Sequence, residues 1–331
     1  MAEYKGIKGF KVPQIATDPT ANEGQTWYNT TTNLLKYDTI GAGAWAAGGS
    51  LNTARPDAFG TGFGIQTAAI CAGGGAPVVV SQTEQYDGTS WTALSAPSNI
   101  SQRYTAQNAA NGTTTAGLIF GGNPPTPGSP HTTNLSEVWN GSTWTATNAM
   151  NSTHRLGGGS GTSTAAACFG GHQNDSVDFN ETEEFNGTTW AVIPAGDMNT
   201  TMSQFSSWGA QTAGVAAGGS PARTVTETYN GATWTTSPGT LNNGRSYAGG
   251  MGSTTAGLIT GGNPLPATQY KTESWNGSTW TEVANSTQSG YAASGAGTQA
   301  LGLKMAGNTS PYMLTEEWDN SPAVVKSVTT S

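Results

Sequence analysis

The stretch WNGSTWT occupies residues 139–145 and returns unchanged at residues 275–281. Three further copies keep an aromatic residue, then Asn or Asp, Gly and Trp: YDGTSWT (86–92), FNGTTWA (185–191) and YNGATWT (229–235). Asn-Gly or Asp-Gly between strand-like runs is the strongest short signal of a β-hairpin, through a type I′ turn with φ > 0 at both central positions. The aromatic residue and the Trp therefore lie on paired strands, where they can pack on one another or on a neighbouring sheet.

A Ser/Thr-Glu pair precedes every copy, and a sixth pair opens the segment TEEWDN (315–320), which lacks the second Trp. The interval between successive glutamates is 43 to 53 residues, which is in the range of propeller blades. We expect these glutamates and tryptophans to be structural residues of the repeat: Glu84, Glu137, Glu183, Glu227, Glu273, Trp91, Trp144, Trp190, Trp234 and Trp280.

An apolar run ending in Gly-Gly lies upstream of each hairpin: TAAICAGG (67–74), TAGLIFGG (115–122), TAAACFGG (164–171), TAGVAAGG (212–219) and TAGLITGG (255–262), with a longer sixth variant at 298–308. Small, uncharged residues predict a strand buried on both faces, and Gly-Gly ends it where a side chain would obstruct the turn. A further strand precedes each run, starting near Arg55, Arg103, Arg155 and Arg245. Each unit therefore has four strands, and we expect these arginines to bond carbonyls or a repeat glutamate. A ring of guanidinium groups that binds an anion is the alternative.

One such sheet cannot bury both its faces alone, whereas six arranged radially can. The sequence predicts an all-β fold, a six-bladed β-propeller of four-stranded blades with a short N-terminal extension. Seven blades and a parallel β-solenoid are the alternatives. Residues 27–48 hold one more hairpin-like pair with Trp45, which either completes the last blade or starts a seventh. We place an N-terminal arm and hairpin at residues 1–48 and the propeller at residues 49–331.

The composition excludes several classes of protein. Only 10% of residues are charged, while there are 47 Gly and 11 Trp, which argues against disorder. A net charge of −8 with 12 Lys plus Arg leaves too little positive charge to grip a nucleic acid. No apolar run approaches 18 residues, so we expect no membrane insertion. The N-terminus lacks the apolar segment of a secretory signal, which predicts synthesis in a cytoplasm.

The Gly-Gly run, the aromatic residue and the Trp together resemble the kelch repeat over roughly residues 50–320. The Ser/Thr-Glu and Asn-Gly positions depart from the common kelch pattern. Kelch-like propellers include copper oxidases, whose site needs two tyrosines, two histidines and a cysteine joined to a tyrosine. The three histidines here, His131, His154 and His172, lack metal-ligand spacing and are expected to be solvated loop residues. We expect no metal, no cofactor and no enzyme activity, since no carboxylate pair stands apart from the repeat.

The segment GQTWYNTTTNLLKYD (24–38) resembles the N-terminal part of tail-fibre and other virion proteins of tailed bacteriophages, especially marine ones. This resemblance implies a structural virion protein, made in the host cytoplasm, located in the virion in multiple copies and contacting other virion proteins. The N-terminal region would then be a docking arm, with a frayed terminus as the alternative. The docking residues would be Tyr4, Lys5, Lys8, Phe10, Lys11, Trp27 and Tyr28.

The loops that follow Gly-Gly differ from unit to unit and are expected to emerge on one face. Variable loops on a constant frame form binding surfaces, with neutral drift as the alternative. The candidate binding residues are Asn123, Pro125, His131, His172, Asp175, Asp178, Pro264 and Tyr312. We expect a non-enzymatic structural or adhesion protein of a phage virion, whose loops contact a host-surface glycan or protein or other virion proteins. A free bacterial propeller that binds carbohydrate or protein is the alternative.

Overall fold

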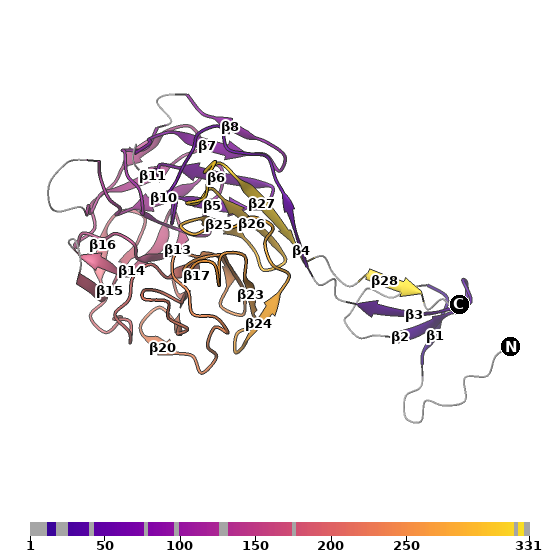
Figure 1. Cartoon of the computed structure of the whole chain (residues 1–331). Helices are drawn as coiled ribbons and strands as arrows, with labels where there is room; N and C mark the ends of the chain where they lie inside the picture. The colour runs from indigo at the N-terminus through magenta and orange to yellow at the C-terminus, as the bar shows by residue number, and fades with distance from the viewer. Residues whose placement is uncertain are drawn as a thin grey trace. The chain divides into compact units, whose positions relative to one another are not determined.

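The computed structural model describes residues 12–17, 26–39, 43–75, 79–95, 99–125, 132–173, 177–320 and 324–327. Within these ranges the regular secondary structure is entirely β-strand, arranged in seven four-stranded sheets (Figure 1). The predicted all-β class and four-stranded units are confirmed, but the predicted number of six sheets is wrong. No helix in the described part of the chain is long and apolar enough to cross a membrane.

The seventh sheet lies outside the repeat, because both ends of the chain contribute to it. Its strands follow the order β1 (Gln14–Ile15), β2 (Thr26–Asn29), β3 (Leu34–Thr39) and β28 (Val324–Ser327). It belongs to a compact unit before Trp45 and after Asp319, which we call the terminal unit. Trp45–Asp319 form a second compact unit, the repeat unit. The two compact units thus meet at Trp45 and at Asp319, whereas the sequence-based division was placed after residue 48.

Five sheets of the repeat unit, numbered I to V, each use four consecutive strands. Sheet I contains β5 (Gly62–Ile65), β6 (Ala68–Ala72), β7 (Thr83–Tyr86) and β8 (Trp91–Ala93). Sheet II contains β9 (Gln107–Asn108), β10 (Gly117–Phe120), β11 (Ser136–Trp139) and β12 (Trp144–Ala146). Sheet III contains β13 (Gly158–Thr162), β14 (Ala165–Gln173), β15 (Val177–Phe185) and β16 (Trp190–Val192).

The next two sheets repeat this antiparallel order. Sheet IV contains β17 (Ser206–Ala210), β18 (Ala213–Ala217), β19 (Thr226–Tyr229) and β20 (Trp234–Thr236). Sheet V contains β21 (Gly249–Ser253), β22 (Ala256–Thr260), β23 (Thr272–Trp275) and β24 (Trp280–Val283).

Sheet VI takes its fourth strand from the other end of the repeat unit. Its strands are β25 (Ser294–Gly297), β26 (Leu301–Met305), β27 (Thr315–Asp319) and β4 (Ala44–Ala47). The Trp45 ring packs on Trp318 with centroids 5.4 Å apart, in place of the Trp missing from the last repeat. Of the two sequence-based alternatives, the structure therefore shows Trp45 completing the last repeat sheet.

The hairpin prediction is confirmed in register but wrong in turn type. Trp139 lies opposite Trp144 in sheet II, and their ring centroids are 5.4 Å apart. Gly141 has φ +95°, whereas Asn140 does not have positive φ, so a type I′ turn is excluded. The reason is that the Asn140 carboxamide oxygen accepts hydrogen bonds from the backbone N–H groups of Ser142 and Thr143, closing the turn through the side chain.

Hydrogen bonds from tryptophan to hydroxyl groups link each sheet to the preceding one around the whole repeat unit. Each fourth-strand Trp donates Nε1–H to the Ser or Thr that precedes the repeat glutamate of the neighbouring sheet. The six pairs, at 2.8 to 3.2 Å, are Trp91–Thr315, Trp144–Thr83, Trp190–Ser136, Trp234–Thr182, Trp280–Thr226 and Trp45–Thr272. These hydrogen bonds connect sheet I to sheet VI, sheet VI to sheet V, and so on until sheet II is connected to sheet I. Such a closed circuit of neighbouring sheets is consistent with a β-propeller.

The hydrophobic core is divided among the interfaces between neighbouring sheets. Six clusters of buried side chains each combine residues of two adjacent sheets. At the interface of sheets I and II, for example, Phe63 and Ile70 pack with Ile119, Trp139 and Trp144. The Trp–hydroxyl bonds therefore satisfy indole N–H groups at the edges of these apolar interfaces.

The repeat glutamates fasten the segment that enters each sheet. Each accepts a backbone N–H from that segment; the donors are Asn52, Ser101, Asn151, Asn199, Asn242 and Thr287. Arg55 pairs with Glu84 at 3.0 Å and also donates to the carbonyls of Gly73 and Gln82. Arg103 and Arg245 make the equivalent contacts with Glu137 and Glu273, as expected of these arginines.

The residue that faces the repeat glutamate differs in the other three sheets. In sheet III the equivalent position is His154, which faces Glu183, so the expected alignment of Arg155 with the other arginines is wrong by one residue. His154 is fully buried rather than a solvated loop histidine. In sheet VI, Lys304 of β26 pairs with Glu316 at 3.1 Å. In sheet IV, Met202 occupies the position, and Glu227 has no cationic partner among the described residues.

Candidate functional site

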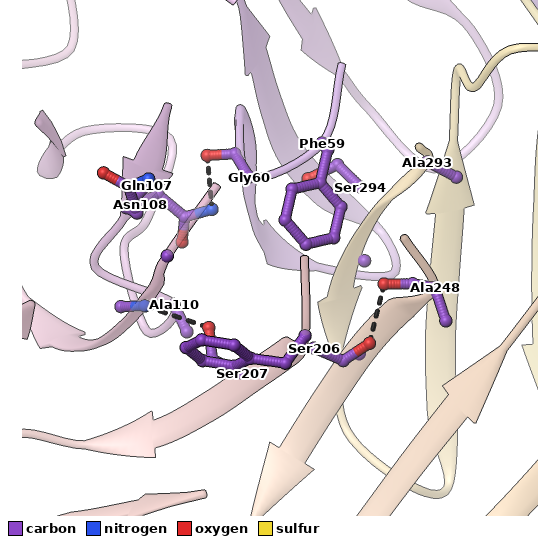
Figure 2. A pocket seen from close by; sticks show the side chains of 15 residues that line it. Phe59, Gly60, Gln107, Asn108, Ala110, Ser206, Ser207, Ala248, Ala293 and Ser294 are labelled. Carbon is purple, nitrogen blue, oxygen red and sulfur yellow. Dashed lines mark hydrogen bonds between the residues drawn. The ribbon is translucent and has the colours of Figure 1, made fainter. Parts of the chain in front are cut away.

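The first strands of the six repeat sheets surround a narrow central cavity. Their lining residues are mostly Gly, Ala and Ser, and Figure 2 shows Asn108 bonded to the Gly60 carbonyl and Ser206 to the Ala248 carbonyl. The free space is about 30 Å³, which admits only a few water molecules. A side chain at Gly159 would place its Cβ 2.2 Å from the Asn108 carbonyl oxygen. A ligand larger than water must therefore bind at an end of this cavity.

One end is encircled by a ring of residues in the left-handed backbone conformation, which we call the left-handed ring. It consists of Asp57, Thr105, Leu156, Gln204, Tyr247 and Ala292, with φ between 50° and 60°. Each later member donates its backbone N–H to the carbonyl of the member before it, at 2.7 to 3.5 Å. Between sheets VI and I, Asn308 Nδ2 donates to Asp57 Oδ1 at 3.2 Å. Non-glycine residues hold this conformation only where the surrounding structure enforces it, and such residues cluster at functional sites.

Aromatic and charged side chains gather on this ring. Tyr247 packs edge-on against Phe59, with centroids 5.6 Å apart, and against Tyr291 at 6.2 Å. Burial raises the pKa of Tyr247 to about 12, and the Asp57 carboxylate adds to the rise while Arg155 opposes it. Burial also raises the pKa of Asp57, against the hydrogen bond from Asn308. We call the five half-buried residues Asp57, Tyr104, Arg155, Tyr247 and Tyr291 the mouth cluster.

Two of the predicted loop residues adjoin the mouth cluster. Asn123 donates its carboxamide N–H to the Tyr104 hydroxyl at 2.6 Å. His172 exchanges two backbone hydrogen bonds with Arg155, and its ring lies 2.7 Å from the Asp178 carboxylate. Burial lowers the pKa of His172, against the attraction of Asp178. The loops after Gly-Gly in sheets II and III thus flank the mouth cluster.

The other predicted residues have different surroundings. Pro125 and Pro264 are exposed, and the Tyr312 carbonyl accepts the backbone N–H of Arg55. In the terminal unit, Trp27 is fully buried and Tyr28 is half-buried on β2. Seven of the predicted binding or docking residues lie outside the described part of the chain: His131, Asp175, Tyr4, Lys5, Lys8, Phe10 and Lys11.

The sequence prediction omitted Asp57, Tyr104, Tyr247 and Tyr291 as site residues. What these residues share in the sequence is their position. Each lies one or two residues after the position that Arg55, Arg103 and Arg245 occupy in their sheets, as in RPD (55–57), RYT (103–105) and RSY (245–247). Sequence patterns did not reveal that this position turns toward the central axis.

The opposite ends of the same first strands border a larger cavity of about 610 Å³. It is lined by the turns between the first and second strands, including Ile65, Asn111, Thr113, Thr254 and Gln299. None of the described residues that line it has a titratable side chain, so those residues offer no general acid or base. The mouth cluster, by contrast, combines perturbed pKa values with convergent polar and aromatic groups, which favours it as the functional site.

A scan against protein-family models and a search of curated proteins each found no match for the chain.

Proposed function

We propose that the six sheets of the repeat unit are blades of a kelch-like β-propeller. The six Trp–hydroxyl bonds and the six shared core clusters support this, because together they make a circuit of interfaces. The terminal sheet contributes no repeat residue and is not a blade in this proposal.

We further propose that the protein is a non-enzymatic adhesion protein whose mouth cluster binds carbohydrate. The observation that carries this proposal is the grouping of three tyrosines with one carboxylate and one guanidinium at the left-handed ring. Tyrosine rings offer an apolar face and a polar hydroxyl, which suits the faces and hydroxyl groups of a sugar. Hydrolysis of a glycosidic bond uses a pair of carboxyl groups, whereas the mouth cluster as defined contains a single one, that of Asp57.

The protein would act in the virion of a tailed phage, with other virion proteins and a host-surface glycan as partners. Support for this comes from the resemblance of residues 24–38 to virion proteins and from a terminal unit that is separate from the repeat unit. Mass spectrometry of purified particles tests it. Absence of the chain from virions, with free protein in the host, would favour the free carbohydrate-binding propeller instead.

A glycan array tests the binding site in the full chain. Tyr247→Ala removes an aromatic ring on which a sugar can stack and should raise the Kd about tenfold or more. A loss of about 1.4 kcal/mol of binding free energy corresponds to a tenfold rise in Kd. The control is Ile65→Ser, at the exposed rim of the 610 Å³ cavity. Binding that survives Tyr247→Ala but is lost in Ile65→Ser would contradict the proposal, as would the absence of any glycan ligand.

A further inference from the structure

We propose that His154, Glu181 and Glu183 of sheet III form a binding site for a divalent transition-metal ion, best matched by Zn²⁺. The site is built into the frame and is independent of carbohydrate binding at the mouth cluster. Its three ligand atoms lie within 4.8 Å of one another. This proposal revises the sequence-based expectation of no metal.

The comparison with the other sheets shows what is unusual here. In sheets I, II, V and VI, one buried glutamate faces one Arg or Lys. Sheet III keeps the glutamate but replaces the arginine by a shorter imidazole. It also carries a second carboxylate, Glu181, two residues before Glu183, where the other sheets have Gln82, Leu135, Val225, Lys271 and Leu314.

The orientation of the imidazole leaves one ring nitrogen facing the carboxylates. His154 Nδ1 is 3.3 Å from the Gly170 carbonyl, to which it can donate a proton, and the ring packs on Phe179. Nε2 then carries the lone pair and lies 3.4 Å from Glu183 Oε1, without a hydrogen bond of adequate geometry. Metal-bound histidines characteristically donate their other N–H to a carbonyl or carboxylate in this way.

The composition of the cluster favours a divalent cation at Nε2. Two carboxyl groups and one imidazole face one another, and a doubly charged cation balances the charge of two carboxylates. Glu183 is fully buried, and Glu181 is held by the Ser152 hydroxyl at 2.6 Å, so both carboxylates are fixed in place. An uncompensated charge in such a position costs several kcal/mol, which favours the divalent ion.

The donor set selects the metal. Zn²⁺ accepts imidazole nitrogen and carboxylate oxygen in a tetrahedral site, whereas Mg²⁺ and Ca²⁺ prefer oxygen ligands alone. Glu181 is half-buried, so the cluster reaches solvent through this ligand, and water would supply the fourth ligand.

Calorimetry with ZnCl₂ on the EDTA-treated full chain tests the proposal, with the visible absorption of Co²⁺ as a second probe. We expect one Zn²⁺ per chain and a rise in Tm on addition of Zn²⁺ but not Mg²⁺. Glu181→Gln should weaken binding at least about tenfold, since even outer partners of a metal contribute that much. His154→Arg restores the cation of sheets I, II and V and should fold normally while losing Zn²⁺ and the Co²⁺ bands.

The matched control is His172→Asn, which removes the other described histidine–carboxylate pair of sheet III and should leave Zn²⁺ affinity unchanged. The proposal is overturned if the folded wild-type chain does not bind Zn²⁺. It is equally overturned if Glu181→Gln and His154→Arg both bind Zn²⁺ as the wild type does.

Discussion

At the outer edge of the repeat unit the same contact is made six times, from a Trp to a Ser or Thr hydroxyl. At the left-handed ring, one backbone conformation is also repeated six times, but it holds six different side chains. At the outer edge, both the backbone conformation and the type of side chain are the same from sheet to sheet. At the left-handed ring, only the backbone conformation is the same. The difference separates residues that hold the frame from residues whose side chains vary, which in our proposal recognise a ligand.

The largest expected effect concerns the glutamates of the frame. Glu84→Gln should cost about 3–5 kcal/mol, because it leaves Arg55 buried without its counter-charge. Glu227→Gln should cost less than about 1 kcal/mol, because Glu227 has no cation to abandon among the described residues and its Oε1 makes no hydrogen bond there. Urea unfolding of the two variants measures the difference. Equal losses of stability in the two variants would show that the ion pair with Arg55 does not account for the contribution of Glu84.

A smaller effect is expected at the hydroxyl acceptors. Thr315→Val keeps the side-chain shape but leaves the Trp91 indole N–H buried without its acceptor, which costs about 1–3 kcal/mol. The exposed Thr92→Val, on the neighbouring fourth strand, is the control and should have little effect. If both variants unfold at the same denaturant concentration, the Trp–hydroxyl bonds do not stabilise the frame.

Acid should act on the two regions in opposite directions. Burial alone would raise the pKa of Glu84, but Arg55 and the Asn52 hydrogen bonds hold it below the ordinary value of 4.5. Its stabilising contribution is present above that value and is lost as the pH falls through the lowered folded pKa. Burial raises the pKa of Asp57 above 3.8, so its contribution is present below that value and is lost as the pH rises through the raised folded pKa.

Thermal unfolding of the wild type and of Asp57→Asn, measured from neutral pH down to below pH 3.8, tests these opposite pH dependences. The variant should exceed the wild type most at neutral pH, and its advantage should shrink as the pH approaches 3.8. A constant advantage would mean that the Asp57 carboxyl does not titrate with a raised pKa. Below about 4.5 both proteins should lose stability as Glu84 becomes protonated.

The smallest effect on stability is expected within the mouth cluster. Tyr291→Phe removes only the hydroxyl group of a half-buried residue and should change the free energy of unfolding by less than about 0.5 kcal/mol. It should nevertheless reduce glycan affinity, because the hydroxyl is a hydrogen-bonding group. A large loss of stability would place Tyr291 in the frame instead.

The sequence predicted most of the frame because its signals are local. Gly-Gly and the aromatic–Trp pairs indicated the strands, and the Trp missing after Glu316 pointed to Trp45. The terminal sheet was not predicted, since β28 pairs with β3 across nearly the whole chain. The register error at Arg155 arose because the adjacent His154 turns inward, and adjacent loop residues of similar character cannot be distinguished by spacing. The mouth cluster depends on a left-handed backbone conformation held by residues of six different types, so their position after the repeat cation did not reveal the conformation.

Hydrogen exchange of the full chain carrying Trp45→Ala tests most directly whether β4 closes the circuit of sheets. Loss of a buried Trp that packs on Trp318 and bonds to Thr272 should cost about 3–5 kcal/mol. We expect faster exchange in β27 (Thr315–Asp319) of sheet VI. Trp27→Ala, which removes a buried Trp of the terminal unit, should leave β27 protected. Unchanged protection of β27 in Trp45→Ala would contradict closure of the circuit by β4.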